Sequence, residues 1–395
     1  MEQKKIPFSP PDISEKEIAN VVEVLRSGWI TTGPKVAEFE KKISEYCAAK
    51  YAVALSSATA GMELILKVFD IGSGDEVITT PYTFAATANI IIHRGIRPVF
   101  VDVKQGDFLI DLQQLSERIT PRTKAIITVD FGGVPVDYDA VKEIVKAKRR
   151  EDIILISDSA HSFGAAYKGK KVGDQFHFHV FSLHAVKNLT TAEGGIITYS
   201  DNLLFGKEDL IRELKYTALH GQSKDALTKM QAGAWKYDIL TDGFKCNMTD
   251  IMAAIGIGQL ERFDGMLRKR EAIFDVYTKA LFAKEWAILP FKKDEAGTET
   301  CYHLYPLRIK GFSEGERDAL IQKMAETGIA TNVHFKPLPM FSYFKQLGYD
   351  IKDYPNAYEQ YANEITLPLY STLALSDAEY VAGELIRFVE EIKAN

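Results

Sequence analysis

The sequence has few cysteines and no cysteine pair of the kind that binds a metal. Three cysteines occur in 395 residues, widely spaced and without a Cys-x-x-Cys pair. This sparse, odd set argues against a disulfide framework and against a zinc knuckle. His177 and His179 lie two residues apart, but no third ligand follows at a suitable spacing, so we predict no metal site. We expect a reducing, cytoplasmic location.

Long apolar runs, basic clusters and nucleotide-binding loops are also missing. No stretch approaches the ~20 apolar residues of a membrane span, and residues 1–5 carry no apolar signal segment. The net charge is −6 and the basic run at 148–150 is short, which argues against a nucleic-acid partner. There is no GxxxxGK[ST] loop, and no GxGxxG follows an early strand. We therefore expect neither a membrane protein nor an ATPase, kinase or dehydrogenase.

The sequence does contain a regular alternation of short apolar runs with helical patterns. Helices are expected over 14–27 and 59–69 and from about 84, 111 and 137. Strands are expected at 51–55, 76–79, 98–103, 125–129, 153–156, 180–182 and 195–199. This order predicts an α/β fold with a mostly parallel sheet flanked by helices. The last two strands leave no room for a crossover helix, so we expect that part of the mixed sheet to be hairpin-like.

The length predicts a second, smaller domain, because one core stops growing well below 395 residues. A helical pattern over 249–283 is a natural bridge between the two parts. Strand candidates at 303–309 and 330–334 and a helix after Ser376 then make a small α+β unit. We predict a large domain over 1–260 and a small C-terminal domain over 261–395.

Lys187 and Asp158 are the residues that most strongly suggest chemistry. Lys187 follows the apolar strand that ends at Ser182, and a glycine pair and a return strand come after it. Asp158 follows the apolar run at 153–156. An amine that can form an imine and a carboxylate that keeps a ring nitrogen protonated are what pyridoxal 5′-phosphate (PLP) chemistry requires of a protein. Each residue alone is ordinary, because most lysines are solvated and most strand-end aspartates are caps.

Other polar and aromatic residues also fall at predicted strand ends, where α/β sheets bind ligands. Residues 56–61 leave a strand and open a helix, whose free N–H groups would favour a phosphate. A plain helix cap explains Ser57 or Thr59 equally well. Phe84 could stack on a flat ring, although an aromatic there more often belongs to the core. His161 follows Asp158 by three residues, which would place it on the same rim.

Taken together, these motifs resemble the PLP-dependent sugar-nucleotide aminotransferases of the DegT-like family across nearly the whole chain. The resemblance is carried by SGWITTGPK at 27–35, SATAGM at 57–62, GDEVIT at 74–79, DSAH at 158–161, SLHAVK at 182–187, EGG at 193–195 and NMTDI at 247–251. It implies a fold-type I transferase that works as a homodimer with active sites at the subunit interface. The chain departs from the family pattern at Ser157, often an acid, at Ser159, often alanine, and at Phe84, a tryptophan in arabinose-modifying members.

The resemblance assigns roles by position. Lys187 would hold PLP covalently and move protons, Asp158 would pair with the ring nitrogen, and His161 would lie near one ring face. The remaining cofactor contacts would be Ser57, Ala58, Thr59, Phe84, Ser182 and, reaching into a partner subunit, Asn247. The substrate contacts would be Thr31, Thr32, His334 and Lys336.

The expected reaction moves an amino group from glutamate, leaving 2-oxoglutarate, to a nucleotide-linked keto-sugar. The opening motif looks most like members that aminate a UDP-linked 4-keto sugar for amino-sugar, cell-surface polysaccharide or lipopolysaccharide biosynthesis. Lys187 argues against a PLP-dependent sugar dehydratase, which has histidine there. An aminotransferase for a cyclitol or inosose and a non-catalytic regulatory protein remain alternatives. The nucleotide, the sugar, the aminated carbon and the choice of glutamate or glutamine stay open.

Overall fold

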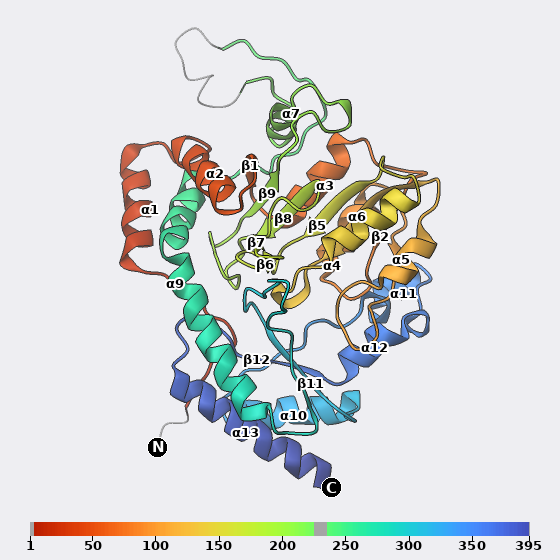
Figure 1. The fold of residues 1–395 in the computed structure, drawn as a ribbon. Helices are drawn as coiled ribbons and strands as arrows, with labels where there is room; N and C mark the ends of the chain where they lie inside the picture. The colour runs from red at the N-terminus through yellow and green to blue at the C-terminus, as the bar shows by residue number, and fades with distance from the viewer. Residues whose placement is uncertain (1–3, 225–234, 395) are drawn as a thin grey trace.

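A seven-stranded mixed sheet forms the centre of the computed structural model, which describes residues 4–224 and 235–394 (Figure 1). The strand order is β1-β9-β8-β5-β4-β2-β3. Neighbours from β3 to β8 run parallel, whereas β9 is antiparallel to both β8 and β1. The strands are β1 (Tyr51–Leu55), β2 (Glu76–Thr79), β3 (Val99–Phe100), β4 (Thr123–Val129), β5 (Ile154–Asp158), β8 (Phe178–Ser182) and β9 (Gly195–Tyr199). The predicted mostly parallel sheet with a hairpin-like part is confirmed.

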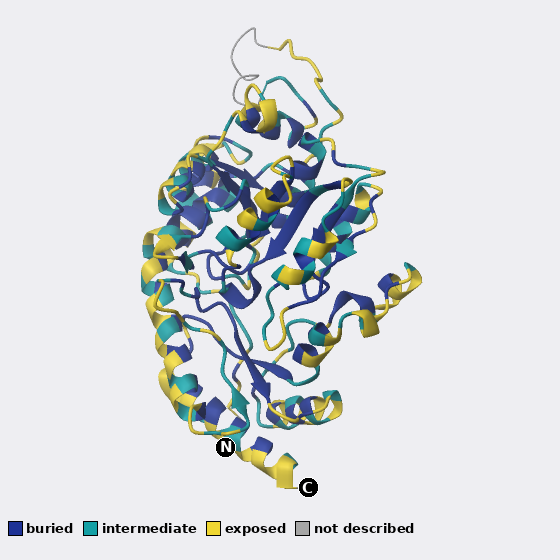
Figure 2. Ribbon diagram, turned by 45° about the vertical axis from the view of Figure 1, so that its right-hand side comes forward, coloured by how far each residue is buried: buried dark blue, intermediate teal, exposed yellow. Residues whose placement is uncertain are grey.

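Helices cover both faces of this sheet because successive residues of each strand point to opposite sides. On β1, Val53 and Leu55 pack into one core while Ala52 and Ala54 pack into the other. The first core is closed by α3 (Ala58–Val68), α4 (Ala85–His93) and α7 (Leu210–Thr217). The second is closed by α2 (Pro34–Tyr46), α5 (Leu112–Arg118) and α6 (Tyr138–Ala147). Figure 2 shows the buried strands between helices whose outer faces are exposed.

The long helix α9 (Asp250–Leu281) leads from the sheet to a small C-terminal α+β part (Figure 1). That part has an antiparallel sheet of β10 (Ala287–Ile288), β11 (Tyr305–Ile309) and β12 (Glu364–Leu367). It packs against α10 (Glu314–Glu326) and α13 (Leu375–Ala394) through its own hydrophobic core. The predicted boundary at 260/261 falls inside α9, and the division into two domains stays a prediction.

Several predicted elements differ from the structure in detail. The strand predicted at 98–103 is only Val99–Phe100, and the last helix starts at Leu375. The strand predicted at 330–334 is wrong. Asn332 makes a single bridge to Thr366, and the His334 N–H then donates to the Glu364 carboxylate instead of to a neighbouring strand. A strand cannot continue where its N–H groups turn to side chains.

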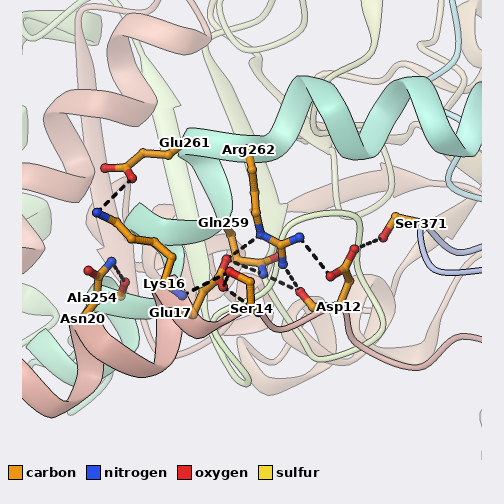
Figure 3. Close-up of polar contacts among 10 residues, drawn as sticks. All are labelled: Asp12, Ser14, Lys16, Glu17, Asn20, Ala254, Gln259, Glu261, Arg262 and Ser371. Carbon is orange, nitrogen blue, oxygen red and sulfur yellow. Dashed lines mark hydrogen bonds and ion pairs between the residues drawn. The ribbon is translucent and has the colours of Figure 1, made fainter.

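The N-terminal segment is fixed to α9 by a cluster of buried and half-buried polar groups (Figure 3). Arg262 donates to Asp12 Oδ1 at 2.9 Å and to Glu17 Oε1 at 2.7 Å, and Glu17 also completes the capping box of α1 (Glu15–Ser27). Ser371, which precedes α13, donates to the other Asp12 oxygen at 2.6 Å. Asp12 thus connects the N-terminal segment to α9 and to the C-terminal part. Residues 8 and 9, just before it, lie in the wall of the cavity described below.

The two histidines considered as metal ligands have structural roles. His177 Nδ1 accepts a hydrogen bond from the Leu155 N–H at 3.0 Å, and His179 Nε2 accepts two backbone N–H groups of the preceding loop. Within residues 4–224 and 235–394, no group of three or more metal-binding side chains comes together. In the same ranges no helix has the length and apolarity to cross a bilayer. Residues 1–3 belong to the segment in which we predicted no signal sequence, and they lie outside the described residues.

Candidate active site

A cavity of about 400 Å³ opens at the carboxyl ends of β5 and β8, beside the N-terminus of α3. Nine of the predicted site residues line it: Ser57, Ala58, Thr59, Phe84, Asp158, His161, Ser182, Lys187 and His334. A larger cavity of about 680 Å³ lies between the loop at 104–112 and the β10 region. It contains none of these residues. The chemistry therefore points to the smaller cavity.

Asp158 is the last residue of β5 and is 5% exposed. Its Oδ2 accepts a hydrogen bond from Thr87 at 2.7 Å, and its Oδ1 accepts one from the Ala160 N–H at 3.2 Å. Burial raises the pKa of Asp158, although these hydrogen bonds and the charge of Lys187 act in the opposite direction. A buried carboxylate of this kind is stabilised by a cationic partner in the cavity, such as a protonated ring nitrogen.

Lys187 lies in a tight turn five residues beyond the end of β8. The turn is closed by hydrogen bonds from the Lys187 N–H to the His184 carbonyl and from the Thr191 N–H to the Leu183 carbonyl, both 2.9 Å. Burial lowers the pKa of Lys187 to about 8, while Asp158 acts to raise it. A substantial share of the amines is therefore neutral near physiological pH, which is the form that attacks a carbonyl carbon.

The N-terminus of α3 supplies a place for an anion. The Ser57 hydroxyl caps the helix by accepting the Ala60 N–H at 3.1 Å, so the plain capping role predicted for it is present. Ser57, Ala58 and Thr59 also line the cavity, where the helix dipole and free N–H groups favour a phosphate. Gly195 explains the glycine motif. A Cβ on it would lie 2.2 Å from the Ala58 nitrogen, so only glycine permits this close packing.

Two histidines form part of the wall in neutral form. His161 Nδ1 accepts the Gly132 N–H at 3.2 Å, which leaves its proton on Nε2. His303 lies beside it, with ring centroids 4.4 Å apart. Its Nδ1 donates to the Asn188 side-chain oxygen, because the Asn188 amide nitrogen is occupied by the Cys301 carbonyl. Burial, Lys187 and neighbouring histidines lower the pKa of both rings well below the usual value.

The C-terminal part and the N-terminal segment complete the cavity. His334 stacks against Phe8, with ring centroids 5.6 Å apart and planes at 21°, and Phe335 stacks on His161 at the same distance. Phe8, His303 and Phe335 were not predicted as site residues. Phe335 lies between His334 and Lys336, so its segment was marked, whereas no sequence signal marks Phe8 or His303. Only His334 was expected here, and it does line the cavity.

Phe84 lies at the cavity mouth as the N-cap residue of α4, where it is 65% exposed. Its ring centroid is 6.3 Å from that of Phe335. An aromatic ring this exposed is more consistent with a ligand or partner contact than with the core position weighed for it.

Four of the predicted residues lie outside this cavity. Asn247 donates to the Thr32 hydroxyl at 2.5 Å, and both line a separate hollow of about 520 Å³. The Thr31 carbonyl accepts the Asp250 N–H, and the Asp250 carboxylate in turn accepts N–H groups at the start of α2. The motifs at 27–35 and 247–251 therefore form one structural unit. Lys336 is exposed and lies over the Phe341 ring.

The chain is similar to known proteins over nearly its whole length. The model of the DegT/DnrJ/EryC1/StrS aminotransferase family matches residues 11–386. The spore coat polysaccharide biosynthesis protein SpsC of Bacillus subtilis is 39% identical over 95% of both chains. The UDP-4-amino-4-deoxy-L-arabinose–oxoglutarate aminotransferase of Shewanella sediminis is 37% identical over 98% of this chain and 99% of its own.

A solved structure shows the same fold. The "Putative sugar aminotransferase" of Streptococcus pneumoniae in its PMP-form has a TM-score of 0.94 and 44% identity, over 98% of this chain and all of that one. Its PLP-form gives a TM-score of 0.93 and 43% identity over the same shares. With a family model that spans almost the whole sequence and relatives this similar, the chain belongs to the DegT/DnrJ/EryC1/StrS aminotransferase family.

Proposed function

We propose that this protein uses PLP to move an amino group from glutamate to a UDP-linked 4-keto sugar, in amino-sugar and cell-surface polysaccharide biosynthesis. The observation that carries the proposal is the meeting of Lys187, Asp158 and the α3 N-terminus in one cavity. These groups come from three separate strand ends of the sheet. They supply an amine, a buried carboxylate and an anion site, which are the protein groups that PLP requires.

The residues present fit PLP at each of its functional groups. The phosphate matches the free N–H groups around Ser57–Thr59, and the protonated ring nitrogen matches the buried carboxylate of Asp158. Phe84 and His161 offer flat surfaces for the ring. When bound, PLP carries the amino group between the two substrates and withdraws electrons from the carbon that loses a proton.

The roles of the chain's own residues follow from their protonation states. Lys187 Nζ, with its lowered pKa, would hold PLP through its amine and, when not so engaged, would accept and return a proton. Asp158, held by Thr87 and the Ala160 N–H, would bind the ring nitrogen of PLP and keep it protonated. His161 is held in one tautomer by the Gly132 N–H and presents Nε2–H to the cavity as a hydrogen-bond donor.

The substrate class is supported by two relatives. The Shewanella sediminis protein is named for a UDP-linked 4-amino sugar and for oxoglutarate, and the Bacillus subtilis protein for spore coat polysaccharide biosynthesis. Both cover almost the whole of this chain. His334 is the predicted substrate contact that lies in the cavity wall, and Lys336, Thr31 and Thr32 would contribute at the mouth only in a complete assembly.

A homodimer with shared sites would explain the position of Asn247. Asn247 and Thr32 face a hollow of their own, so any contact of Asn247 with the cofactor needs a second subunit. Large apolar side chains are exposed nearby in the sequence, among them Ile30 at 49% and Ile239 at 54%. We also propose a cytoplasmic location and a division into a large PLP-binding domain over 1–260 and a small C-terminal domain over 261–395.

The colour of the purified protein tests the cofactor. PLP bound through a lysine absorbs visible light, so we expect a yellow protein whose absorption band shifts on addition of glutamate. Borohydride reduction followed by peptide mapping should locate the label on Lys187, and Lys187→Ala should be colourless and inactive. A label on another residue would contradict the proposal.

The substrate needs a separate experiment. The protein is first converted to its pyridoxamine form with glutamate or glutamine, which identifies the donor. UDP-, GDP- and dTDP-linked keto-sugars are then offered, and amino-sugar formation is followed by mass spectrometry. We expect the UDP-linked 4-keto sugars to react fastest. A deoxy-sugar product would identify a dehydratase, and reaction with an inosose alone would identify a cyclitol aminotransferase.

A further inference from the structure

Two fully buried polar residues, Glu364 and Thr366, lie directly behind His334. They are two apart on β12, so their side chains point to the same face of the small sheet. The Thr366 hydroxyl contacts Glu364 Oε1, and its oxygen lies 3.0 Å from His334 Nδ1. One continuous chain of hydrogen bonds therefore runs from the protein interior to the cavity wall.

The imidazole at the end of this chain is held firmly in place. The His334 N–H donates to Glu364 Oε2 at 2.9 Å, and the Tyr82 hydroxyl donates to the His334 carbonyl at 2.8 Å. Phe8 stacks on the ring. With Nδ1 occupied by Thr366, Nε2 is the ring nitrogen left for the cavity, and it has no hydrogen-bond partner in the part of the chain that the structure describes.

The chain of hydrogen bonds has two states, because the Thr366 hydroxyl carries one proton. With Glu364 ionised, Thr366 donates to Glu364 and accepts from His334 Nδ1–H, so Nε2 is a hydrogen-bond acceptor. With Glu364 protonated, its O–H donates to Thr366, and Thr366 donates to Nδ1. The ring proton is then on Nε2, which becomes a donor. A proton on the buried carboxyl thus decides what His334 presents to the cavity.

No salt bridge among the described side chains holds the Glu364 carboxyl in its ionised form, so it can gain or lose a proton. Arg317 directs its Nη1 to the backbone carbonyls of Tyr361 at 2.7 Å and Glu364 at 3.3 Å, and Glu364 has no ion pair among the described side chains. Burial raises the pKa of Glu364 to about 8, although Thr366, His334 and Arg317 act to lower it.

The imidazole itself stays neutral. Burial, together with the charge of Lys187, lowers the pKa of His334 to about 3. Of the three residues in this chain of hydrogen bonds, Glu364 is therefore the one that titrates near pH 8. The other titratable or charged groups that face this hydrogen-bond chain are Arg317, Arg308, Tyr82, Lys187, His161 and His303. Arg308 lies opposite Glu364 on β11, and its guanidinium donates to the Gln360 side chain and to the Gly106 carbonyl.

We infer that Glu364, Thr366 and His334 form a proton relay to the oxygen of the keto substrate, an inference that rests on the proposed function. When nitrogen replaces this oxygen, the C–O bond breaks and its electron pair goes to oxygen. His334 Nε2–H gives its proton to that oxygen, Thr366 gives its proton to Nδ1, and Glu364 gives its proton to Thr366. The oxygen leaves as water, its second proton coming from the attacking amine. The nitrogen, now doubly bonded to carbon, keeps its remaining proton and carries the positive charge that balances the ionised Glu364.

The same protons move in reverse in the other half of the reaction. Water adds there to release the keto acid, and Nε2 accepts the proton while Glu364 becomes neutral again. The full cycle therefore leaves the relay unchanged. In this scheme His334 touches the reacting oxygen, and Glu364 and Thr366 are positioning residues that act through it.

The tautomer of His334 tests the relay without any turnover. In ¹⁵N-histidine-labelled holoenzyme, NMR distinguishes a protonated Nδ1 from a protonated Nε2, and loss of signals in His334→Gln assigns them. We expect Nε2–H below pH 7 and Nδ1–H above pH 9. Because a glutamine at 364 can only donate to Thr366 while it accepts the His334 N–H, Glu364→Gln should hold Nε2–H at every pH. One unchanged tautomer from pH 6 to 10 in the unmodified protein would overturn the inference.

Three variants then separate the relay from a purely structural role. Thr366→Val breaks the chain and should abolish the tautomer change, whereas Thr366→Ser restores the hydroxyl and should restore the change. Glu364→Gln should lower kcat by about 100-fold with little change in KM, since the proton can no longer be supplied. It should also lose the contribution of Glu364 to the pH–rate profile near pH 8, so that only the pH dependence of Lys187 remains there.

The outcomes distinguish the relay from the function on which it rests. Unchanged kcat and an unchanged pH profile in Glu364→Gln would overturn the relay even if the protein is an active aminotransferase. A tautomer change that follows Glu364 in a protein that aminates no keto-sugar would instead contradict the proposed function and support the hydrogen-bond chain.

Discussion

Lys187 gives the sharpest quantitative test of the site, because its amine must lose a proton before it can attack PLP. Its pKa is lowered to about 8, chiefly by burial. About a quarter of the amines are then neutral at pH 7.5, against about one in a thousand for a lysine with the ordinary value. The rate of covalent PLP attachment to cofactor-free protein should therefore rise about eightfold from pH 6.5 to 7.5 and level off near pH 9.

Asp158 allows the cause of this shift to be tested. Its carboxylate stabilises the Lys187 ammonium, so Asp158→Asn should move the attachment curve to lower pH. Glu285→Gln removes one carboxylate from an exposed position outside the cavity wall and should leave the curve in place. Attachment is followed by stopped-flow absorbance after PLP is added. A curve that keeps rising to pH 10, or that moves upward in Asp158→Asn, would refute the reasoning.

The remaining predictions concern the cofactor, the assembly and the fold. Asp158→Asn should retain bound PLP yet lose most of its amino-transfer rate, and an unchanged rate would exclude its role at the ring nitrogen. Gly195→Ala should lower the free energy of unfolding by about 1–3 kcal/mol and weaken PLP binding, because the new Cβ meets backbone at 2.2 Å; denaturant titration measures the first and absorbance the second. If sites are shared in a dimer, co-expressed Lys187→Ala and Asn247→Ala chains should recover activity that neither has alone, and a mixture as inactive as its components would contradict this. Since the pKa of Glu364 is raised on folding, the folded state holds an extra proton between about pH 4.5 and 8 and is destabilised as pH rises through that window. From pH 5 to pH 9, the free energy of unfolding of Glu364→Gln should therefore rise by about 4 kcal/mol relative to that of the unmodified protein. Urea unfolding measures this difference, and an equal loss of stability with pH in both proteins would show that Glu364 is ionised throughout.

The mostly parallel character of the large sheet and most of the residues that line the cavity could be predicted, because the relevant signals are local. Buried strands, helix caps and strand-end residues each occupy a few consecutive positions. Lys187 and Asp158 carry their meaning within such short motifs, and the glycine at 195 is required by a contact with the neighbouring turn at 57–58. Parallel strands place their carboxyl ends along one edge, so residues that follow several strands meet there without further information.

The other wall of the cavity depends on contacts that no local pattern records. His303, His334 and Glu364 lie in the C-terminal part, and Phe8 reaches the cavity because Asp12 is bound to Arg262 and Ser371. The predicted strand at 330–334 failed for the same reason, since the His334 N–H turns to a side chain 30 residues away.

The sequence by itself determined the α/β class, the family and the pairing of an amine with a buried carboxylate, because these depend on residue type and short-range order. Only the tertiary structure decided which residues of the C-terminal part face Lys187 and that a buried glutamate lies behind His334. It also separated Asn247 and Thr32 from the cavity of their own chain. The contacts between distant segments depend on how the cores of the large sheet and of the C-terminal part pack against α9. The composition and periodicity of a single segment do not determine this packing.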